Sequence, residues 1–132
     1  MMDRIVNVFF SQPMNGKIDE EIAVERTYMI SEFRDFLIDE LGFSDDVVIC
    51  DVNGCYVKAG PENAGRLWYL GRSIQNMDKA DYIVFHKDWR SASGCWVEHA
   101  AAEMYFKWRF GDSNGQPSVS EHICEIAFGR DR

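Results

Sequence analysis

Short unbroken apolar runs recur along the chain, separated by longer segments of helical periodicity. The runs at residues 4–10, 47–50 and 82–85 are rich in β-branched and aromatic side chains and have the length of a buried strand. Unbroken rather than alternating runs are typical of strands that are covered on both faces, as in a parallel sheet. We therefore expect three parallel strands that are connected through helices.

Three further segments carry apolar side chains at spacings of three, four and seven residues, the spacing of one helix face. Asp19 is suited to cap the first helix, and Gly42 is suited to end it. The positions expected to face the core are Ile22, Met29, Ile30, Phe33, Leu37 and Leu41 in the first segment, Ala64, Leu67, Trp68, Gly71, Ile74 and Met77 in the second, and Trp96, Ala100, Met104 and Trp108 in the third.

The alternation of strand and helix predicts an α/β fold, a three-layer sandwich around a small, mostly parallel, flavodoxin-like or Rossmann-like sheet of four or five strands. Right-handed crossovers place the first strand at the centre, between the second and the third. Alternate apolar positions within residues 122–128 predict a further strand. We expect residues 1–132 to form one domain, because a chain of this length buries enough surface for a single core.

Acidic residues outnumber basic ones, with 22 Asp and Glu against 14 Lys and Arg, which gives a net charge of −8. This charge repels a phosphate polyanion and disfavours binding to a nucleic-acid polymer. No apolar stretch has the length of a membrane span, and the short apolar run near the amino terminus, broken by Asn7, is too short for a secretory signal core. We therefore expect a cytoplasmic protein with no membrane partner.

The four cysteines form no Cys-x-x-Cys pair, and a core of this size does not need disulfides, so we expect reduced thiols. A zinc site made of Cys50, Cys55, Cys95 and His99 is an alternative. The spacing of its first two cysteines is loose, however, and Cys50 falls in a buried-strand pattern. We therefore expect no metal.

In a sheet of this topology, ligands bind at the carboxyl ends of the strands where the winding direction reverses, here between the first and third strands. Two polar loops follow these strands, and the second covers residues 86–94. The first offers Ser11, Asn15 and the amides around Gly16. Lys17 follows, just before a helix amino terminus that favours a phosphate or carboxylate. The alternative is a plain proline–glycine turn with a surface lysine, because the P-loop pattern is missing.

Glu98 lies one turn into the third helix, among apolar and small residues. At this edge of the sheet, a carboxylate is suited to attack an electrophilic sugar carbon or to act as a general base. The alternative is an acid that complements the helix macrodipole. From the preceding loop we expect Asp88, Trp89 and Gly94 to contact a substrate, with Trp89 stacking on a planar ring unless it belongs to the core.

Three segments carry a resemblance to a known family. They are the first strand with the following SQPMNGK and the acidic helix start DEE, then LGRSIQNMDKADYIVF, and then GCWVEHAAAEMY. With these segments the chain resembles the nucleoside 2-deoxyribosyltransferase-like superfamily, most closely its small bacterial and phage members, over nearly its whole length. Members with known activity cleave or transfer the N-glycosidic bond of deoxynucleosides or deoxynucleotides.

The resemblance implies roles for individual residues. Glu98 aligns with the glutamate that attacks the anomeric carbon, while Ser11, Asn15, Gly16 and Lys17 fall in the loop that binds the sugar or its 5′-phosphate. The reaction needs neither a metal nor an organic cofactor. Relatives commonly form homo-oligomers in which a neighbouring chain completes the pocket, so the resemblance implies a homodimer or higher homo-oligomer.

One position departs from the family pattern. Active members carry an aspartate eight residues before the Asp of the third strand's Ala-Asp pair, which helps to protonate or orient the base, and here that position is Ser73. A serine hydroxyl cannot act as that acid at neutral pH. Asp88 or His86 could replace it, or the leaving base could be held differently, or the protein could bind a nucleotide without cleaving it.

These observations leave three hypotheses for the function. The leading one is cleavage or transfer of the deoxyribosyl group of a small nucleoside or nucleotide, with Glu98 as the nucleophile. The alternative is a nucleotide-binding or sensing module without catalysis. The third is a protein-interaction module that uses aromatic side chains, which could instead form a homodimer. These aromatic side chains are Trp68, Tyr69, Tyr105 and Trp108.

Overall fold

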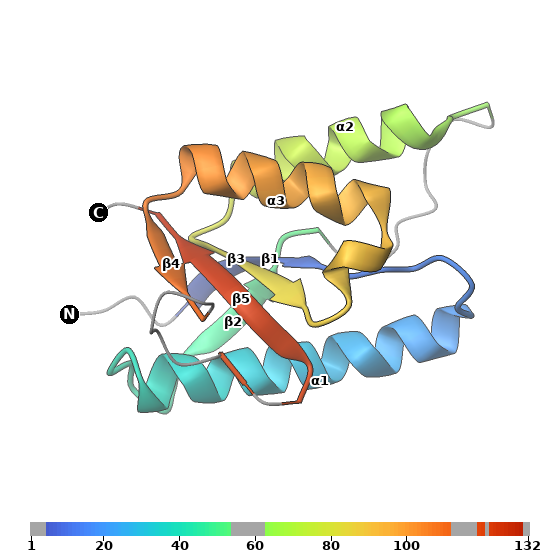
Figure 1. Ribbon diagram of the computed structural model, residues 1–132. Coiled ribbons are helices and arrows are strands. Elements are labelled where there is room, and N and C mark those ends of the chain that lie inside the picture. The colour runs from blue at the N-terminus through green and yellow to red at the C-terminus, as the bar shows by residue number, and fades with distance from the viewer. Residues whose placement is uncertain (1–4, 54–62, 112–118, 121, 131–132) are drawn as a thin grey trace.

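The computed structural model describes residues 5–53, 63–111, 119–120 and 122–130 (Figure 1). Strands and helices alternate through most of this part of the chain, and two short strands end it. In chain order the elements are β1 (Ile5–Ser11), α1 (Asp19–Asp39), β2 (Val48–Asp51), α2 (Arg66–Met77), β3 (Tyr82–His86), a 3-10 turn (Trp89–Ser91), α3 (Ser93–Tyr105), β4 (Trp108–Phe110) and β5 (Cys124–Gly129).

The five strands form one mixed sheet in the order β2-β1-β3-β5-β4. β1 runs parallel to both of its neighbours, β2 and β3, as the sequence predicted. β5 joins β3 in the antiparallel direction, and β4 joins β5 in the same way. The carboxyl ends of β1 and β3 therefore lie side by side, and the residues that follow them share one edge of the sheet.

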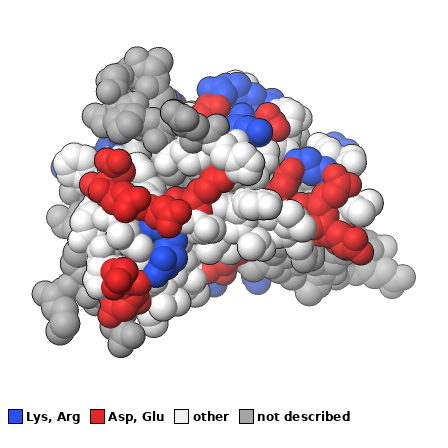
Figure 2. Space-filling model, turned by 90° about the horizontal axis from the view of Figure 1, so that it is seen from below, with Lys and Arg blue, Asp and Glu red and all other residues white. Residues whose placement is uncertain are grey.

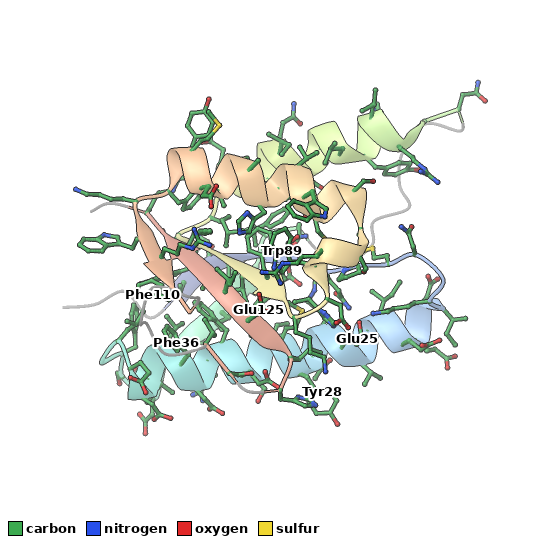
Figure 3. All side chains as sticks on the ribbon, in the orientation of Figure 1. Glu25, Tyr28, Phe36, Trp89, Phe110 and Glu125 are labelled. Carbon is green, nitrogen blue, oxygen red and sulfur yellow. The ribbon has the colours of Figure 1, made fainter. Side chains whose placement is uncertain are left out.

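Helices cover both faces of the sheet, which makes a three-layer α/β sandwich (Figure 1). α1 packs on one face, where its Phe33 shares a core cluster with Phe10 of β1, and α2 and α3 pack on the other over Phe9 and Phe85. Figure 3 shows the labelled Trp89 between the sheet and α3. Because side chains alternate along β1, Ser11 falls on the α3 face and Gln12 on the α1 face.

The first helix agrees closely with its predicted pattern. Ile22, Met29, Phe33 and Leu37 are buried, as expected. The expected cap is wrong, however, because Ile18 takes the N-cap position and Asp19 is the first helical residue. The helix ends at Asp39, and Gly42 follows with a φ of 74°, the left-handed conformation that glycine adopts at little cost.

The predicted inner face of α2 is confirmed in part, and that of α3 is wrong. In α2, Met77 is buried and Ile74 packs beside it in the core, but Leu67 is 81% exposed. α3 turns the predicted stripe of Trp96 and Met104 outward, and Trp108 belongs to β4 instead. The side chains that α3 buries are Cys95, Glu98, His99 and Ala102. The prediction assumed that the largest apolar side chains face the core, but α3 packs on the sheet through small and polar side chains.

The expectation that β2 is covered on both faces is also wrong. β2 pairs with β1 alone and forms an edge of the sheet, where Val48 and Cys50 are exposed. Among the helices of the described ranges, none combines the length and the apolar character that crossing a membrane requires.

Candidate active site

Ser11 and Glu98 meet at the carboxyl edge of the sheet. Ser11 is the last residue of β1, and Glu98 lies in the second turn of α3, the helix that follows β3. The Ser11 hydroxyl donates a hydrogen bond of 2.7 Å to Glu98 Oε1, although the two residues are 87 positions apart. Both side chains are buried, with Glu98 8% exposed. Ser11 and Glu98, both predicted to belong to the site, are therefore in direct contact.

Two further side chains complete this group, which we call the α3 cluster: Ser11, Ser73, Cys95 and Glu98. Ser73, from α2, hydrogen-bonds to the Glu98 carboxyl group. Cys95 lies one turn before Glu98 and contacts the Ser11 hydroxyl, while burial raises the pKa of its thiol to about 11. A protonated thiol is a poor nucleophile, so Glu98 is the reactive group of this cluster.

The environment of Glu98 places its titration close to neutral pH. Burial raises the pKa of Glu98 to about 7, against hydrogen bonds from Ser11 and Ser73 and the charge of Arg26, which lower it. Both protonation states are therefore populated at neutral pH. A carboxyl group of this kind can act as a nucleophile or base when ionised and as an acid when protonated.

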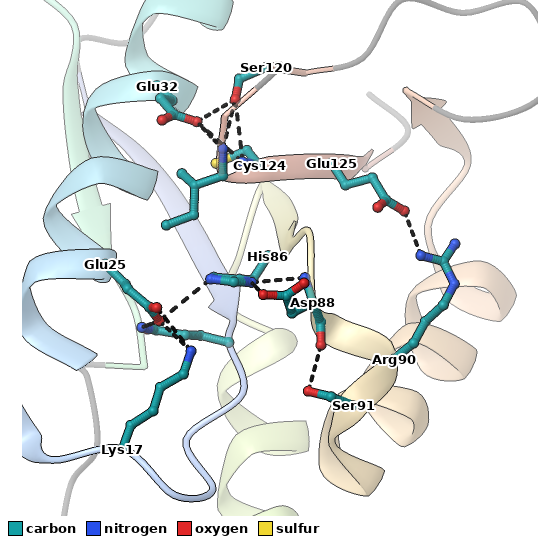
Figure 4. A network of polar contacts seen from close by, with 12 residues as sticks. Lys17, Glu25, Glu32, His86, Asp88, Arg90, Ser91, Ser120, Cys124 and Glu125 are labelled. Carbon is teal, nitrogen blue, oxygen red and sulfur yellow. Dashed lines mark hydrogen bonds and ion pairs between the residues drawn. The ribbon is translucent and has the colours of Figure 1, made fainter. Parts of the chain in front are cut away.

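A second polar group lies on the α1 face of the same edge, and we call it the α1 cluster: Gln12, Lys17, Glu25, Arg26 and His86. Figure 4 shows Lys17, Glu25 and His86 of this cluster. Lys17 Nζ lies 2.8 and 2.9 Å from the two carboxylate oxygens of Glu25. The Gln12 amide donates to the same carboxylate over 3.1 Å. Burial alone would raise the pKa of Glu25, but these hydrogen bonds and the charge of Lys17 outweigh it and lower the pKa.

His86, the last residue of β3, is a neutral member of the α1 cluster. Its Nδ1 accepts the backbone N–H of Asp88 over 2.9 Å, so the proton resides on Nε2, which faces Glu25 Oε1 at 3.4 Å. Burial lowers the pKa of His86. The ring is 1% exposed and Nδ1 accepts a backbone hydrogen bond, which disfavours His86 as the acid for a leaving base.

Arg26 ties the α1 cluster to the strand ends. Its Nη1 donates to Asp51 Oδ2 over 2.7 Å, at the end of β2, and its Nε donates to the Gln12 side chain over 3.0 Å. Asn53 adds a hydrogen bond to the Phe10 carbonyl over 3.0 Å. The cation is buried and fully engaged, so it links Gln12, which follows β1, to Asp51 at the end of β2.

The remaining predicted site residues have different surroundings. Asn15 and Gly16 are exposed in the turn before α1, where Gly16 adopts a φ of 75°. Gly94, in the first turn of α3, is half-buried and has open space where a side chain would stand. Asp88 is exposed and follows His86 in the second loop.

Trp89 does not offer a stacking surface, contrary to the expectation from the sequence. It is 2% exposed and stacks on His99, with ring centroids 4.1 Å apart and planes 3° apart. The guanidinium group of Arg90 lies 4.6 Å from the centroid of the same ring. Trp89 belongs to the core beneath α3.

Glu25, Arg26 and Gln12 were missed by sequence reasoning. One signal was present, because Arg26 lies four residues after Ile22 and three before Met29, both in the apolar stripe of α1. A charged residue at a core position of an amphipathic helix requires buried partners. Nothing comparable marked Gln12 or Glu25.

The proposed zinc ligands do not assemble in the part of the chain that the structure describes. Cys50 is exposed on the edge strand and Cys95 is buried in α3, while Cys55 lies outside the described residues. Within those residues, no three His, Cys, Asp or Glu side chains are grouped so that they could hold a metal ion.

Comparisons of the chain with protein-family models, curated proteins and solved structures found no match.

Proposed function

We propose that this protein cleaves or transfers the N-glycosidic bond of a small deoxynucleoside or deoxynucleotide, with Glu98 as the nucleophile. The observation that carries the proposal is the buried Glu98 carboxyl group, hydrogen-bonded by Ser11 at the carboxyl edge of β1 and β3. Ligands of α/β sheets bind at this edge, next to the point where the strand order reverses. The resemblance to the nucleoside 2-deoxyribosyltransferase-like superfamily supports the same assignment.

The first step forms a covalent intermediate. An oxygen of ionised Glu98 attacks C1′ of the deoxyribose, and the C1′–N bond breaks with its electron pair staying on the base nitrogen. That nitrogen takes a proton from water. Ser11 and Ser73 hold the carboxylate in a fixed orientation, and Ser11 does so over 2.7 Å.

The second step releases the sugar. Water attacks C1′ and returns a proton to solvent, and the electron pair of the ester bond returns to the Glu98 carboxylate. If the nitrogen of a second base attacks instead, the deoxyribosyl group is transferred. Hydrolysis yields free base and 2-deoxyribose, or its 5-phosphate from a nucleotide, whereas transfer yields a new nucleoside or nucleotide.

One incubation tests the proposal. The protein is mixed with a panel of deoxynucleosides and their 5′-monophosphates, with and without a second free base, and the products are separated by chromatography. We expect release or exchange of a base, and its loss in Glu98→Gln, which retains the size of the side chain. Intact folding of the variant is checked by circular dichroism, and a wild-type protein that releases no base from any member of the panel contradicts the proposal.

A nucleotide-binding module without catalysis is the second candidate function, and Ser73 favours it. Ser73 occupies the position where the resemblance expects an acid, and it hydrogen-bonds to Glu98. Under this reading Glu98 is a ligand-binding group, and a nucleoside or nucleotide raises the thermal midpoint of the protein without being consumed. Base release that depends on Glu98 excludes this candidate.

We also propose that the chain forms a homodimer or higher homo-oligomer through α2 and the outer side of α3. Large apolar side chains are exposed on both helices, including Leu67 at 81% and Tyr105 at 78%. The two helices contact each other on the same face of the sheet (Figure 1). Apolar side chains gathered in this way are typical of interaction surfaces.

A further inference from the structure

The loop between β1 and α1 carries one cation, Lys17, and the structure gives that cation a partner. Both carboxylate oxygens of Glu25 lie within 2.9 Å of Lys17 Nζ, at 2.8 and 2.9 Å. The two side chains are about one-quarter exposed, so they border solvent at the sheet edge. Their charges cancel, which leaves no net attraction for an anion at this point of the loop.

Glu25 is held firmly in this position. The Gln12 amide donates to it over 3.1 Å, and His86 Nε2 faces it at 3.4 Å. These contacts fix the carboxylate over the carboxyl ends of β1 and β3, where Figure 4 shows it between Lys17 and His86. The charge of Lys17 also acts on Cys95, where it opposes the rise of the thiol pKa, so the α1 cluster lies within electrostatic range of the α3 cluster.

The amino terminus of α1 is likewise occupied by negative charge. The first turn carries Asp19, Glu20 and Glu21, and a Glu21 carboxylate oxygen accepts the backbone N–H of Ile18 over 3.4 Å. Acidic side chains gather at the end of the molecular surface where α1 begins (Figure 2). The positive end of the helix dipole is therefore complemented from within the chain.

The other basic groups of the α1 cluster add no free positive charge. Arg26 is buried and donates to Asp51 over 2.7 Å. His86 is neutral, because burial lowers its pKa and Nδ1 accepts a hydrogen bond. A 5′-phosphate, with about two negative charges at neutral pH, would meet an ionised Glu25 here and no unpaired cation of this cluster.

We propose that Glu25 is a specificity-determining residue that selects an unphosphorylated deoxynucleoside over its 5′-monophosphate. It does so by neutralising Lys17, so that no free cation of this loop attracts a phosphate, and by presenting a carboxylate that can accept a hydrogen bond from a sugar hydroxyl. This inference rests on the proposed glycosidic activity and names the substrate class of the same site. It replaces the expectation that the loop after β1 binds a 5′-phosphate through Lys17.

The first test compares a deoxynucleoside with its 5′-monophosphate on the wild-type protein. We expect kcat/KM to be higher for the nucleoside by about tenfold or more, the effect of one unfavourable charge contact at the edge of a protein. A nucleotide that is used as well as the nucleoside, or better, overturns the inference and leaves the proposed function standing. Absence of base release from both compounds overturns the proposed function, and the inference with it.

The second test changes the paired charges. Glu25→Gln leaves Lys17 without its carboxylate, so we expect the ratio of nucleoside to nucleotide kcat/KM to fall by about tenfold, mainly through a lower KM for the nucleotide. Adding Lys17→Met to this variant should cancel the fall. Glu20→Gln is the matched control, because it removes the same charge from an exposed position of the first turn of α1.

Each result bears on the assignment of Glu25. A fall in the ratio that is equally large in Glu20→Gln would show that overall charge sets the preference, which overturns a specific role for Glu25. A fall that persists after Lys17→Met would overturn the role of the pair. If Glu25→Gln does not fold, the wild-type ratio of the two substrates decides the matter.

Discussion

Replacing Glu98 by glutamine should stabilise the protein at alkaline pH while removing its activity. The carboxyl group is buried, and burial raises its pKa from 4.5 to about 7. The folded state therefore binds this proton more tightly than the unfolded state does, and the contribution of Glu98 to stability is greatest below pH 4.5. It decreases as the pH rises toward 7, and above pH 7 the ionised carboxylate imposes its full cost.

The free-energy cost of the ionised Glu98 side chain follows from the shift of its pKa. At 1.36 kcal/mol per pKa unit, the ionised group destabilises the fold by about 3 kcal/mol above pH 7. Glutamine keeps the size and an acceptor oxygen for Ser11 but carries no charge. In a domain of this length about 3 kcal/mol corresponds to roughly 10 °C in the thermal midpoint. We expect that increase at pH 8 and little difference near pH 4.5.

The assay is thermal unfolding followed by circular dichroism between pH 4.5 and 8. Glu103→Gln is the matched control, because Glu103 is exposed on the same helix and pairs with Arg109 at the surface over 2.9 Å. Its effect on the midpoint should be small and should not grow with pH. An equal or lower midpoint for Glu98→Gln at pH 8 would show that burial does not govern the titration of Glu98.

Three further predictions follow from other contacts. Ser11→Ala removes a hydrogen bond to the proposed nucleophile, so the rise of kcat with pH should move upward by about one unit, whereas Ser11→Thr should retain the wild-type profile. Glu32→Ala removes a carboxylate that accepts the Cys124 backbone N–H over 3.2 Å. It should therefore cost about 2 kcal/mol in urea unfolding, against almost nothing for the exposed Asp35→Ala on the same helix. Leu67→Lys places a charge at an exposed position of α2, so it should shift the protein from dimer to monomer in size-exclusion chromatography with light scattering and leave its thermal midpoint unchanged. A wild-type protein that is already monomeric contradicts the proposed interface.

The order of the central strands was predictable, because each step depends on a strong local signal. The unbroken runs ending at Phe10 and Phe85 marked the two strands, and right-handed crossovers placed them side by side. Once the edge of the sheet was known, the meeting of Ser11 and Glu98 was expected, because Ser11 directly follows the first run and Glu98 lies near the start of the helix that follows the second. Topology, rather than any property of the two residues, brought them together.

The inner face of α3 was not predictable from its apolar pattern. Trp96 and Met104 have the larger apolar surfaces, yet the helix buries Glu98 and Ala102 against the sheet. Two faces of this helix carry apolar side chains, so periodicity alone cannot choose between them. Hydrophobicity predicts that a glutamate lies at the surface rather than in the core. Departures from this rule are expected at functional sites.

The partner of Lys17 could not be predicted either, since eight positions separate it from Glu25, and Lys17 lies in the loop before α1 whereas Glu25 lies within the helix. The short strand β4 was missed for a different reason. Its three residues, Trp108–Phe110, pair only with β5 at the edge of the sheet, and three residues are too few for a period to be recognised.

The sheet separates two carboxyl groups, Glu98 and Glu25, whose pKa values are shifted in opposite directions. Ser11 and Gln12 are neighbours in the chain, but the pleat directs them to opposite faces, where one contacts Glu98 and the other contacts Glu25. Burial raises the pKa of Glu98 to about 7, whereas hydrogen bonds from Lys17 and Gln12 outweigh burial and lower the pKa of Glu25. Two acids whose environments push their pKa values apart take different roles in a site. Near neutral pH, Glu98 can change its charge during a reaction while Glu25 keeps its charge, which supports the proposed roles of Glu98 in chemistry on the α3 face and of Glu25 in recognition on the α1 face.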